Sequence, residues 1–223
     1  MEYTHKPVLL NECIEALNIR PDGVYVDGTL GRAGHSREIA QRLTTGRLIC
    51  IDRDMAAIDA AKERLAPWMD RVMLVHSNLA ELGNVLREAG VAGADGMLFD
   101  LGVSSPQLDD ASRGFSYLQD APLDMRMDAS APLTAHEVVN VWSYEELRRI
   151  LFEYGEERYA PAIAKAIVRA RETGPVETTL ELVDIIKGPC PQRPCGRSST
   201  PPSGAFRPSA SPSTASWTPC RPC

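Results

Sequence analysis

The chain has 223 residues, of which 43% are hydrophobic, so it can bury the core of one large domain or two small ones. It has no apolar run of about 18 residues that could cross a membrane and no signal-peptide layout at its start, so we expect a cytoplasmic protein. The formal net charge is −6, and residues 1–187 carry 20 basic against 30 acidic side chains. This excess of acidic residues argues against sequence-independent binding of nucleic acid, so any nucleic-acid contact must be made by a local basic patch.

Short aliphatic runs alternate with helical patterns in the first hundred residues. Strands are predicted at 24–26, 48–51, 72–75 and 97–99, and helices at 8–17, 55–65 and 79–89. Asp54 is interpreted as the cap of the second of these helices. This rhythm is typical of βαβ units, so we predict an α/β fold with a Rossmann-like parallel sheet.

After the fourth strand the alternation stops. Residues 101–133 are predicted to form a long loop, which is uncommon in a compact domain unless the loop is functional. From Thr134 onward the pattern is helical, with capping boxes that begin at Ser143 and Thr178 and an amphipathic helix at 159–173. Three basic residues on or beside this helix could face RNA or simply solvent. They are Arg158, Lys165 and Arg169.

Composition changes abruptly at residue 188. The segment 188–223 holds nine of the 17 prolines and seven serines, with no acid, Leu, Ile, Val or Met, so we expect it to be disordered. Four of the six cysteines also fall here, and their final C-x-x-C spacing leaves a zinc site open as an alternative to the absence of metal that we favour. They are Cys190, Cys195, Cys220 and Cys223. The other two, Cys13 and Cys50, are interpreted as buried thiols.

The first predicted strand runs into the segment 27–35, which reads DGTLGRAGH and opens a helix. Glycines let the backbone turn sharply and approach a ligand closely, and a helix N-terminus offers free N–H groups. We therefore predict a nucleotide-type cofactor here. The spacing G-x-x-G-x-x-G departs from the dinucleotide pattern G-x-G-x-x-G, which weakens the alternative of an NAD-type oxidoreductase. A tight turn without any ligand is the other alternative.

Acidic residues follow three of the four predicted strands. Asp52 ends the second strand, where a carboxylate can accept both ribose hydroxyls of a nucleoside. Because the carboxyl ends of parallel strands meet at one edge, we expect Asp27, Asp52, the turn 76–79 and Asp100 to ring one crevice. Four strand ends that agree are better evidence for a ligand site than any one of them.

Five motifs, in order, closely resemble those of the RsmH (MraW) methyltransferases, and the resemblance runs from about residue 3 to 187. They are HKPVLLNE at 5–12, DGTLGRAGHS at 27–36, DLGVSSPQLD at 100–109, RGFS at 113–116 and PLDMRMD at 122–128. The resemblance implies a class I S-adenosylmethionine-dependent methyltransferase fold with a helical insertion. It also implies methyl transfer to N4 of a cytosine in small-subunit (16S) ribosomal RNA near the decoding centre, with that RNA or the assembling small subunit as partner.

Carried over by position, the resemblance implies seven cofactor contacts. They are Ala33, Gly34, His35, Asp52, Leu79, Asp100 and Gln107. Ala33 stands where the family often has glycine, and Leu79 stands where it often has an aromatic residue, so the packing around the adenine can differ here. The domain division that follows is a Rossmann-like cofactor domain at 1–107, a loop and helical substrate-recognition module at 108–187, and the tail at 188–223.

The resemblance ends at Lys187, where the family continues with more helices, a basic segment and the last strands of the sheet. We interpret the tail that begins at Gly188 as an out-of-frame end, so we expect an incomplete sheet and leave the activity of this chain open. A non-catalytic nucleotide-binding or ribosome-associated module is the alternative.

Methyl transfer from a sulfonium is a direct displacement, so the protein mainly has to align the reacting atoms and exclude water. The N4 lone pair of cytosine is delocalised into the ring, and acceptors that hold the amine protons should make it more nucleophilic. The candidates are Asp100, as catalytic residue, with carbonyls of the loop after it, and secondarily Asp124. The target base must leave its stack, and Phe115 and Tyr117 could stack on it or merely pack in the core.

Overall fold

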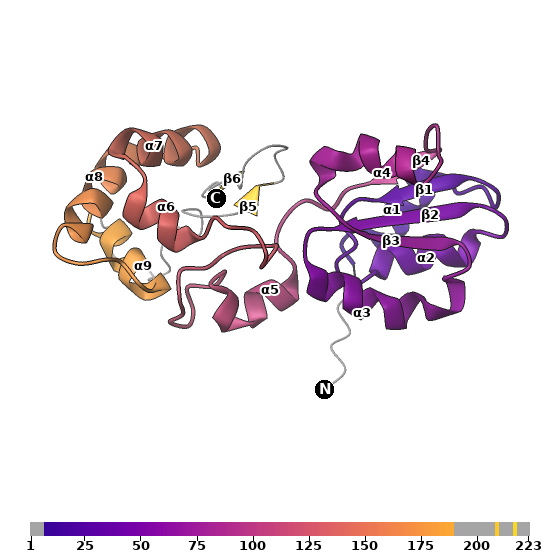
Figure 1. Ribbon diagram of the computed structural model, residues 1–223, viewed down its shortest axis with the longest axis horizontal. Coiled ribbons are helices and arrows are strands. Elements are labelled where there is room, and N and C mark those ends of the chain that lie inside the picture. Colours follow the sequence, from indigo (N-terminus) through magenta and orange to yellow (C-terminus); the bar gives the residue numbers. More distant parts are fainter. Residues whose placement is uncertain (1–6, 190–207, 210–215, 218–223) are drawn as a thin grey trace. The chain divides into compact units, whose positions relative to one another are not determined.

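The computed structural model describes residues 7–189 and two short strands at 208–209 and 216–217. The described residues form two compact units, which divide after residue 101 (Figure 1). Within these described ranges, no helix is both long and apolar enough to cross a bilayer.

The first unit contains a sheet of four parallel strands in the order β3-β2-β1-β4. The strands are β1 (Val24–Asp27), β2 (Arg47–Asp52), β3 (Val72–His76) and β4 (Gly96–Leu98). In the register, Asp27 pairs with Cys50 on one side and Leu98 on the other, and Asp52 pairs with His76. All four carboxyl ends therefore lie at one edge of the sheet, which confirms the predicted α/β, Rossmann-like fold.

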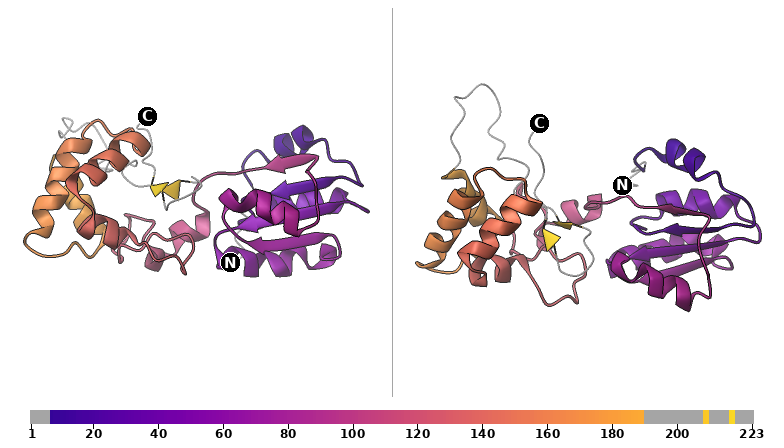
Figure 2. Two further views of the ribbon diagram at one scale, coloured as in Figure 1. Left: turned by 45° about the horizontal axis from the view of Figure 1, so that its top comes forward. Right: turned by 90° about the horizontal axis from the view of Figure 1, so that it is seen from above.

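Helices cover both faces of this sheet (Figures 1 and 2). They are α1 (Leu10–Leu17), α2 (Gly34–Arg42), α3 (Met55–Leu65), η1 (Ala66–Trp68), η2 (Leu79–Glu81) and α4 (Leu82–Glu88). Ile14, Ile39 and Ile58 pack from the first three on one face, and Val85 of α4 packs on the other. The central strands are buried on both sides, as the near-continuous apolar runs of a parallel sheet require.

Local signals account for most of these boundaries. Asp54 caps α3 as predicted, since its side chain accepts a hydrogen bond from the backbone N–H of Ala56 at 3.0 Å. The helix predicted from residue 8 begins only at Leu10, because Leu9 adopts a left-handed backbone conformation with φ of 49°. The helix predicted at 79–89 is divided, because the Asn78 side chain caps a separate first turn, η2.

The second unit is mostly helical (Figure 2). Its elements are α5 (Ser105–Asp109), η3 (Ala111–Arg113), α6 (Ala135–Val141), α7 (Tyr144–Arg149), the π-helical turn η4 (Ile150–Tyr154), α8 (Ala160–Arg171), α9 (Thr179–Lys187), β5 (Pro208–Ser209) and β6 (Ser216–Trp217). Their core includes Val139, Leu151 and Ile167, each at most 1% exposed. Both predicted capping boxes, at Ser143 and Thr178, are confirmed.

The structure divides the chain after residue 101, six residues before the boundary predicted at 107. The physical reason lies in the predicted loop 101–133, which contains α5 and η3. A capping box between Ser104 and Gln107 begins α5, and the sequence analysis did not identify it.

The predicted disordered tail, 188–223, lies outside the described residues except for its first two residues, β5 and β6, and so do the four cysteines of the alternative zinc site. Among the residues that the structure describes, no group of three or more His, Cys, Asp or Glu side chains could hold a metal ion. Cys50 is a buried free thiol as predicted, whereas Cys13 is only half-buried.

Candidate functional site

The glycine-containing turn lies across the carboxyl ends of the sheet strands. The backbone N–H of Gly28 donates to the Leu98 carbonyl of β4 at 2.9 Å, and that of Leu30 donates to the Ile51 carbonyl of β2 at 3.1 Å. Gly31 and Ala33 both have left-handed backbones, with φ of 49° and 58°. This conformation costs a residue with a Cβ about 1–2 kcal/mol, so the glycine at 31 is explained and Ala33 is strained.

Asp27 is directed into the fold, with 1% of its surface exposed. Its carboxylate accepts hydrogen bonds from the Thr29 backbone N–H at 3.1 Å and from the Ser36 hydroxyl at 2.5 Å. Burial raises the pKa of Asp27, and the two hydrogen bonds oppose that rise only in part. The expectation that Asp27 lines a crevice with the other acids is therefore wrong, because its carboxylate holds the turn to α2 from inside.

Asp52 joins the turn to the end of β2, at the position that the sequence predicted for ribose binding. One carboxylate oxygen accepts from the Gly31 backbone N–H at 2.8 Å, and the other accepts from the Asp54 backbone N–H at 2.9 Å. Each oxygen has a second lone pair, so two ligand hydroxyls can still be accepted. Partial burial raises the pKa of Asp52, and these backbone hydrogen bonds oppose the rise.

Gly34 and His35 begin helix α2. The N-cap position makes no side-chain hydrogen bond to the helix, so the first N–H groups of α2 can bind a carboxylate or another polar ligand group. The His35 side chain is buried, and its Nε2 lies 3.1 Å from the Val8 carbonyl. A Cβ at Gly34 would collide with Pro7. The segment before α1 is therefore packed against this helix start.

Asp100 follows β4 and is exposed at the same edge of the sheet. Its backbone N–H donates to the Thr29 hydroxyl at 2.6 Å, so the chain after β4 is tied to the turn after β1. The sequence analysis did not single out Thr29. A hydroxyl two residues after the end of a strand, within a glycine-containing turn, is the signal that could have indicated it.

Leu79 and Phe99 lie against Gly28. Leu79 is half-buried at the start of η2, and Phe99 directly follows β4 with 44% of its surface exposed. A Cβ at Gly28 would lie 2.6 Å from Leu79 Cδ2 and 2.5 Å from Phe99 Cδ1. Phe99 was missed by the sequence analysis, because its contact with Gly28 depends on the pairing of β1 with β4.

Gln107 belongs to the second unit. Its side chain is 6% exposed, and Oε1 accepts from the Ser104 backbone N–H at 2.9 Å in the capping box of α5. The first unit thus brings together six of the seven residues predicted to contact a cofactor, and Gln107 is the seventh.

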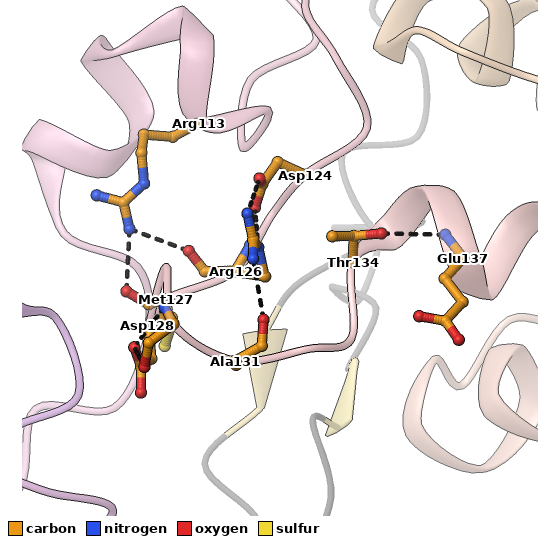
Figure 3. A network of polar contacts seen from close by, with 9 residues as sticks. Arg113, Asp124, Arg126, Met127, Asp128, Ala131, Thr134 and Glu137 are labelled. Atoms are coloured by element: carbon orange, nitrogen blue, oxygen red, sulfur yellow. Dashed lines mark hydrogen bonds and ion pairs between the residues drawn. The ribbon is translucent and has the colours of Figure 1, made fainter.

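A second polar network braces the segment around the PLDMRMD motif (Figure 3). The Arg126 guanidinium donates to both carboxylate oxygens of Asp124, at 2.9 and 2.7 Å, and to the Ala131 carbonyl at 2.9 Å. Arg113 donates to the carbonyls of Arg126 and Met127, both at 3.0 Å. Arg126 lowers the pKa of Asp124. The Asp124 carboxylate is therefore already paired with Arg126, which argues against its suggested role in activating an amine.

The burial of the other residues suggested for RNA contact differs between the aromatic and the basic ones. Phe115 packs against the core of the second unit, with the Arg113 guanidinium 5.8 Å from its ring centre, which favours the packing alternative. Tyr117 is half-buried. The three basic residues of the predicted RNA-facing stripe are all exposed, on or just before α8. They are Arg158, Lys165 and Arg169.

A parallel sheet with a glycine-containing turn after β1 and a carboxylate at the end of β2 defines a Rossmann-like fold of the class that binds nucleotide-type cofactors. The sequence model of the MraW methylase family matches residues 2–207. The chain belongs to this family.

Three curated relatives are 50–55% identical to this chain over the aligned residues. The relative from Brevibacillus brevis is 54% identical over 188 residues, which cover 84% of this chain and 60% of the relative. The relative from Clostridioides difficile is 55% identical over 194 residues, 86% of this chain and 62% of the relative. The relative from Finegoldia magna is 50% identical over 193 residues, with 86% and 62% covered. Each is named ribosomal RNA small subunit methyltransferase H, and this chain spans about three fifths of their length.

Proposed function

We propose that this protein transfers a methyl group from S-adenosylmethionine to N4 of a cytosine in small-subunit ribosomal RNA. The observation that carries the proposal is the edge of the first unit's sheet, where Asp52 holds the turn backbone at Gly31 and Asp100 is tied to Thr29. Membership of the MraW methylase family and the names of the relatives support the same chemistry.

The residues at this edge fit the cofactor. S-adenosylmethionine supplies an electrophilic methyl group on a sulfonium. The remaining lone pairs of Asp52 would accept its ribose hydroxyls, and the N–H groups of Gly34 and His35 at the start of α2 would bind its carboxylate. Ala33 would present its backbone, and Leu79 would contact the base.

Asp100 is the residue that we propose to act on the target amine. Its side chain is exposed while its backbone is fixed by Thr29, so the carboxylate can accept an amine proton without the loop having to reorganise. A hydrogen bond from the amine to this carboxylate orients the amine so that the nitrogen lone pair faces the methyl group. Correct alignment is the main requirement of a direct displacement. The target cytosine must be unstacked to reach this edge, which single-stranded or splayed RNA permits at lower cost.

Calorimetry with S-adenosylhomocysteine and with NAD tests the binding part of the proposal. We expect heat of binding with the first ligand and none with the second. Binding of NAD alone would instead favour an oxidoreductase.

The catalytic part is tested with Asp100→Ala, at saturating cofactor, by incorporation of labelled methyl groups into small-subunit RNA and into small-subunit particles. We expect a fold like that of the wild type and a rate at least about 100-fold lower, the lower end of what positioned proton acceptors contribute. Asp59→Ala is the matched control, because Asp59 is an exposed acid that pairs with Lys62 on α3. Unchanged methylation by Asp100→Ala would remove Asp100 from the mechanism. Cofactor binding without methylation by the wild type would favour a non-catalytic module.

A further inference from the structure

The Phe99 side chain is partly exposed to solvent and also packs against the turn after β1. It is an aromatic side chain with 44% of its surface exposed, yet the edge of its ring is packed against the backbone of Gly28. One side of the ring is therefore fixed by the turn after β1, while another side remains open.

Leu79 reaches the same point from a different part of the chain. It follows β3, whereas Phe99 follows β4, and these strands lie at opposite ends of the sheet order. Both side chains converge on Gly28, and a Cβ there would lie 2.6 Å or less from each. Gly28 does not have a left-handed backbone, so the need for glycine at this position arises from these two side chains. The absence of a side chain at Gly28 thus allows Leu79 and Phe99 to form a continuous apolar surface beside the turn after β1.

This surface lies beside the carboxylate that would hold a ribose. Asp52 ends β2, the strand between β3 and β1, so its neighbours at the edge are the segment that leads to Leu79 and the turn that contains Gly28. A nucleoside whose ribose hydroxyls bind Asp52 carries its base within reach of an apolar, partly aromatic surface. A flat purine gains most from contact with an exposed aromatic ring.

We propose that Phe99, with Leu79, forms the contact surface for the adenine ring of the cofactor. This inference rests on the proposed function, because adenine enters only as part of S-adenosylmethionine. Phe99 is then a binding residue, and the glycine at 28 is required because it lets Phe99 and Leu79 meet.

The test measures binding of S-adenosylhomocysteine by calorimetry to the full chain and its variants. Stacking of a base on an aromatic side chain is worth about tenfold or more in affinity, so Phe99→Ala should bind at least about tenfold more weakly. Phe99→Trp should retain binding, and the fluorescence of the new tryptophan should be quenched by the ligand. Met97→Ala is the matched control, because Met97 is 40% exposed on β4, two residues before Phe99, and makes no part of this surface.

Two further variants keep the test decisive if Phe99→Ala is destabilised. Phe99→Leu keeps the apolar packing on Gly28 and removes only the ring, so it should still weaken binding several-fold. Leu79→Phe in the Phe99→Leu background should restore part of that loss. Adenosine should lose affinity by the same factor as S-adenosylhomocysteine, whereas methionine should lose none.

Equal affinity of the wild type and Phe99→Leu, or a loss that is the same for methionine as for adenosine, would overturn the inference while leaving the proposed function intact. If the wild type itself fails to bind S-adenosylhomocysteine, the proposed function is overturned, and this inference falls with it.

Discussion

The buried carboxylate of Asp27 offers a direct test of what stabilises the glycine-containing turn after β1. Asp27→Ala would leave the Thr29 N–H and the Ser36 hydroxyl without their partner in the interior. Each buried polar group without a partner costs about 1–3 kcal/mol, so the free energy of unfolding should fall by about 2–6 kcal/mol. Asp27→Asn keeps the shape, since its oxygen can accept from Thr29 and its amide can donate to a rotated Ser36 hydroxyl. Its cost should stay below about 1 kcal/mol.

The charge on Asp27 also predicts a dependence on pH. Burial raises the pKa of Asp27 in the folded state above its ordinary value of 3.8, so the folded chain binds a proton more readily than the unfolded chain. The contribution of Asp27 to stability is therefore largest at low pH and declines as pH rises from about the ordinary pKa through the raised one. Asp27→Asn has no such group, so its stability relative to the wild type should improve across that window.

Urea unfolding followed by circular dichroism between pH 4 and pH 7 measures both effects. Asp22→Asn serves as control, because Asp22 is an exposed acid in the turn before β1 and should change stability by no more than about 0.5 kcal/mol. If Asp27→Asn destabilised the protein as much as Asp27→Ala at every pH, the negative charge itself would be holding the turn, and the reasoning from burial would be refuted.

Two other predictions concern arginines. Arg64 of α3 donates to the Arg32 carbonyl in the turn at 3.0 Å, and loss of one exposed hydrogen bond is worth about 0.5–1 kcal/mol, so Arg64→Gln should weaken S-adenosylhomocysteine binding about two- to fivefold in calorimetry. Unchanged affinity would show that the turn keeps its shape without Arg64. Arg126 lowers the pKa of Asp124, so this pair stabilises the fold above the ordinary carboxyl pKa and ceases to do so as pH falls below it. Asp124→Asn should cost about 1 kcal/mol at pH 7 and progressively less in unfolding measurements toward pH 3, and a cost that does not vary with pH would contradict this.

Features encoded within a few residues could be predicted from the sequence. Strand ends followed by acids, the Asp54 cap and the two capping boxes all depend on side chains that bond to backbone groups two or three positions away. The sheet edge that gathers Asp52 and Asp100 was predictable as well, because parallel strands necessarily end together.

What the sequence could not show depends on pairing between distant segments. Asp27 and Asp52 both end a strand, yet only Asp27 of the two is fully buried. Its carboxylate points to the first turn of α2, where it accepts a hydrogen bond from the Ser36 hydroxyl. The meeting of Leu79 and Phe99 at Gly28 likewise needs the strand order to be known. The double hydrogen bond between Arg126 and Asp124 depends on rotamers that no periodicity encodes.

The position of Asp52 has a consequence for how this sequence can evolve. The same carboxylate supports the turn through Gly31 and the start of α3 through Asp54, and it is also the predicted ribose acceptor. A substitution here would be selected against twice, once for the fold and once for the ligand. A descendant that had lost catalysis would still be under pressure to keep this acid. Its presence is therefore a marker of ancestry for the fold, whereas changes at the exposed Asp100 would record relaxed selection on the proposed chemistry.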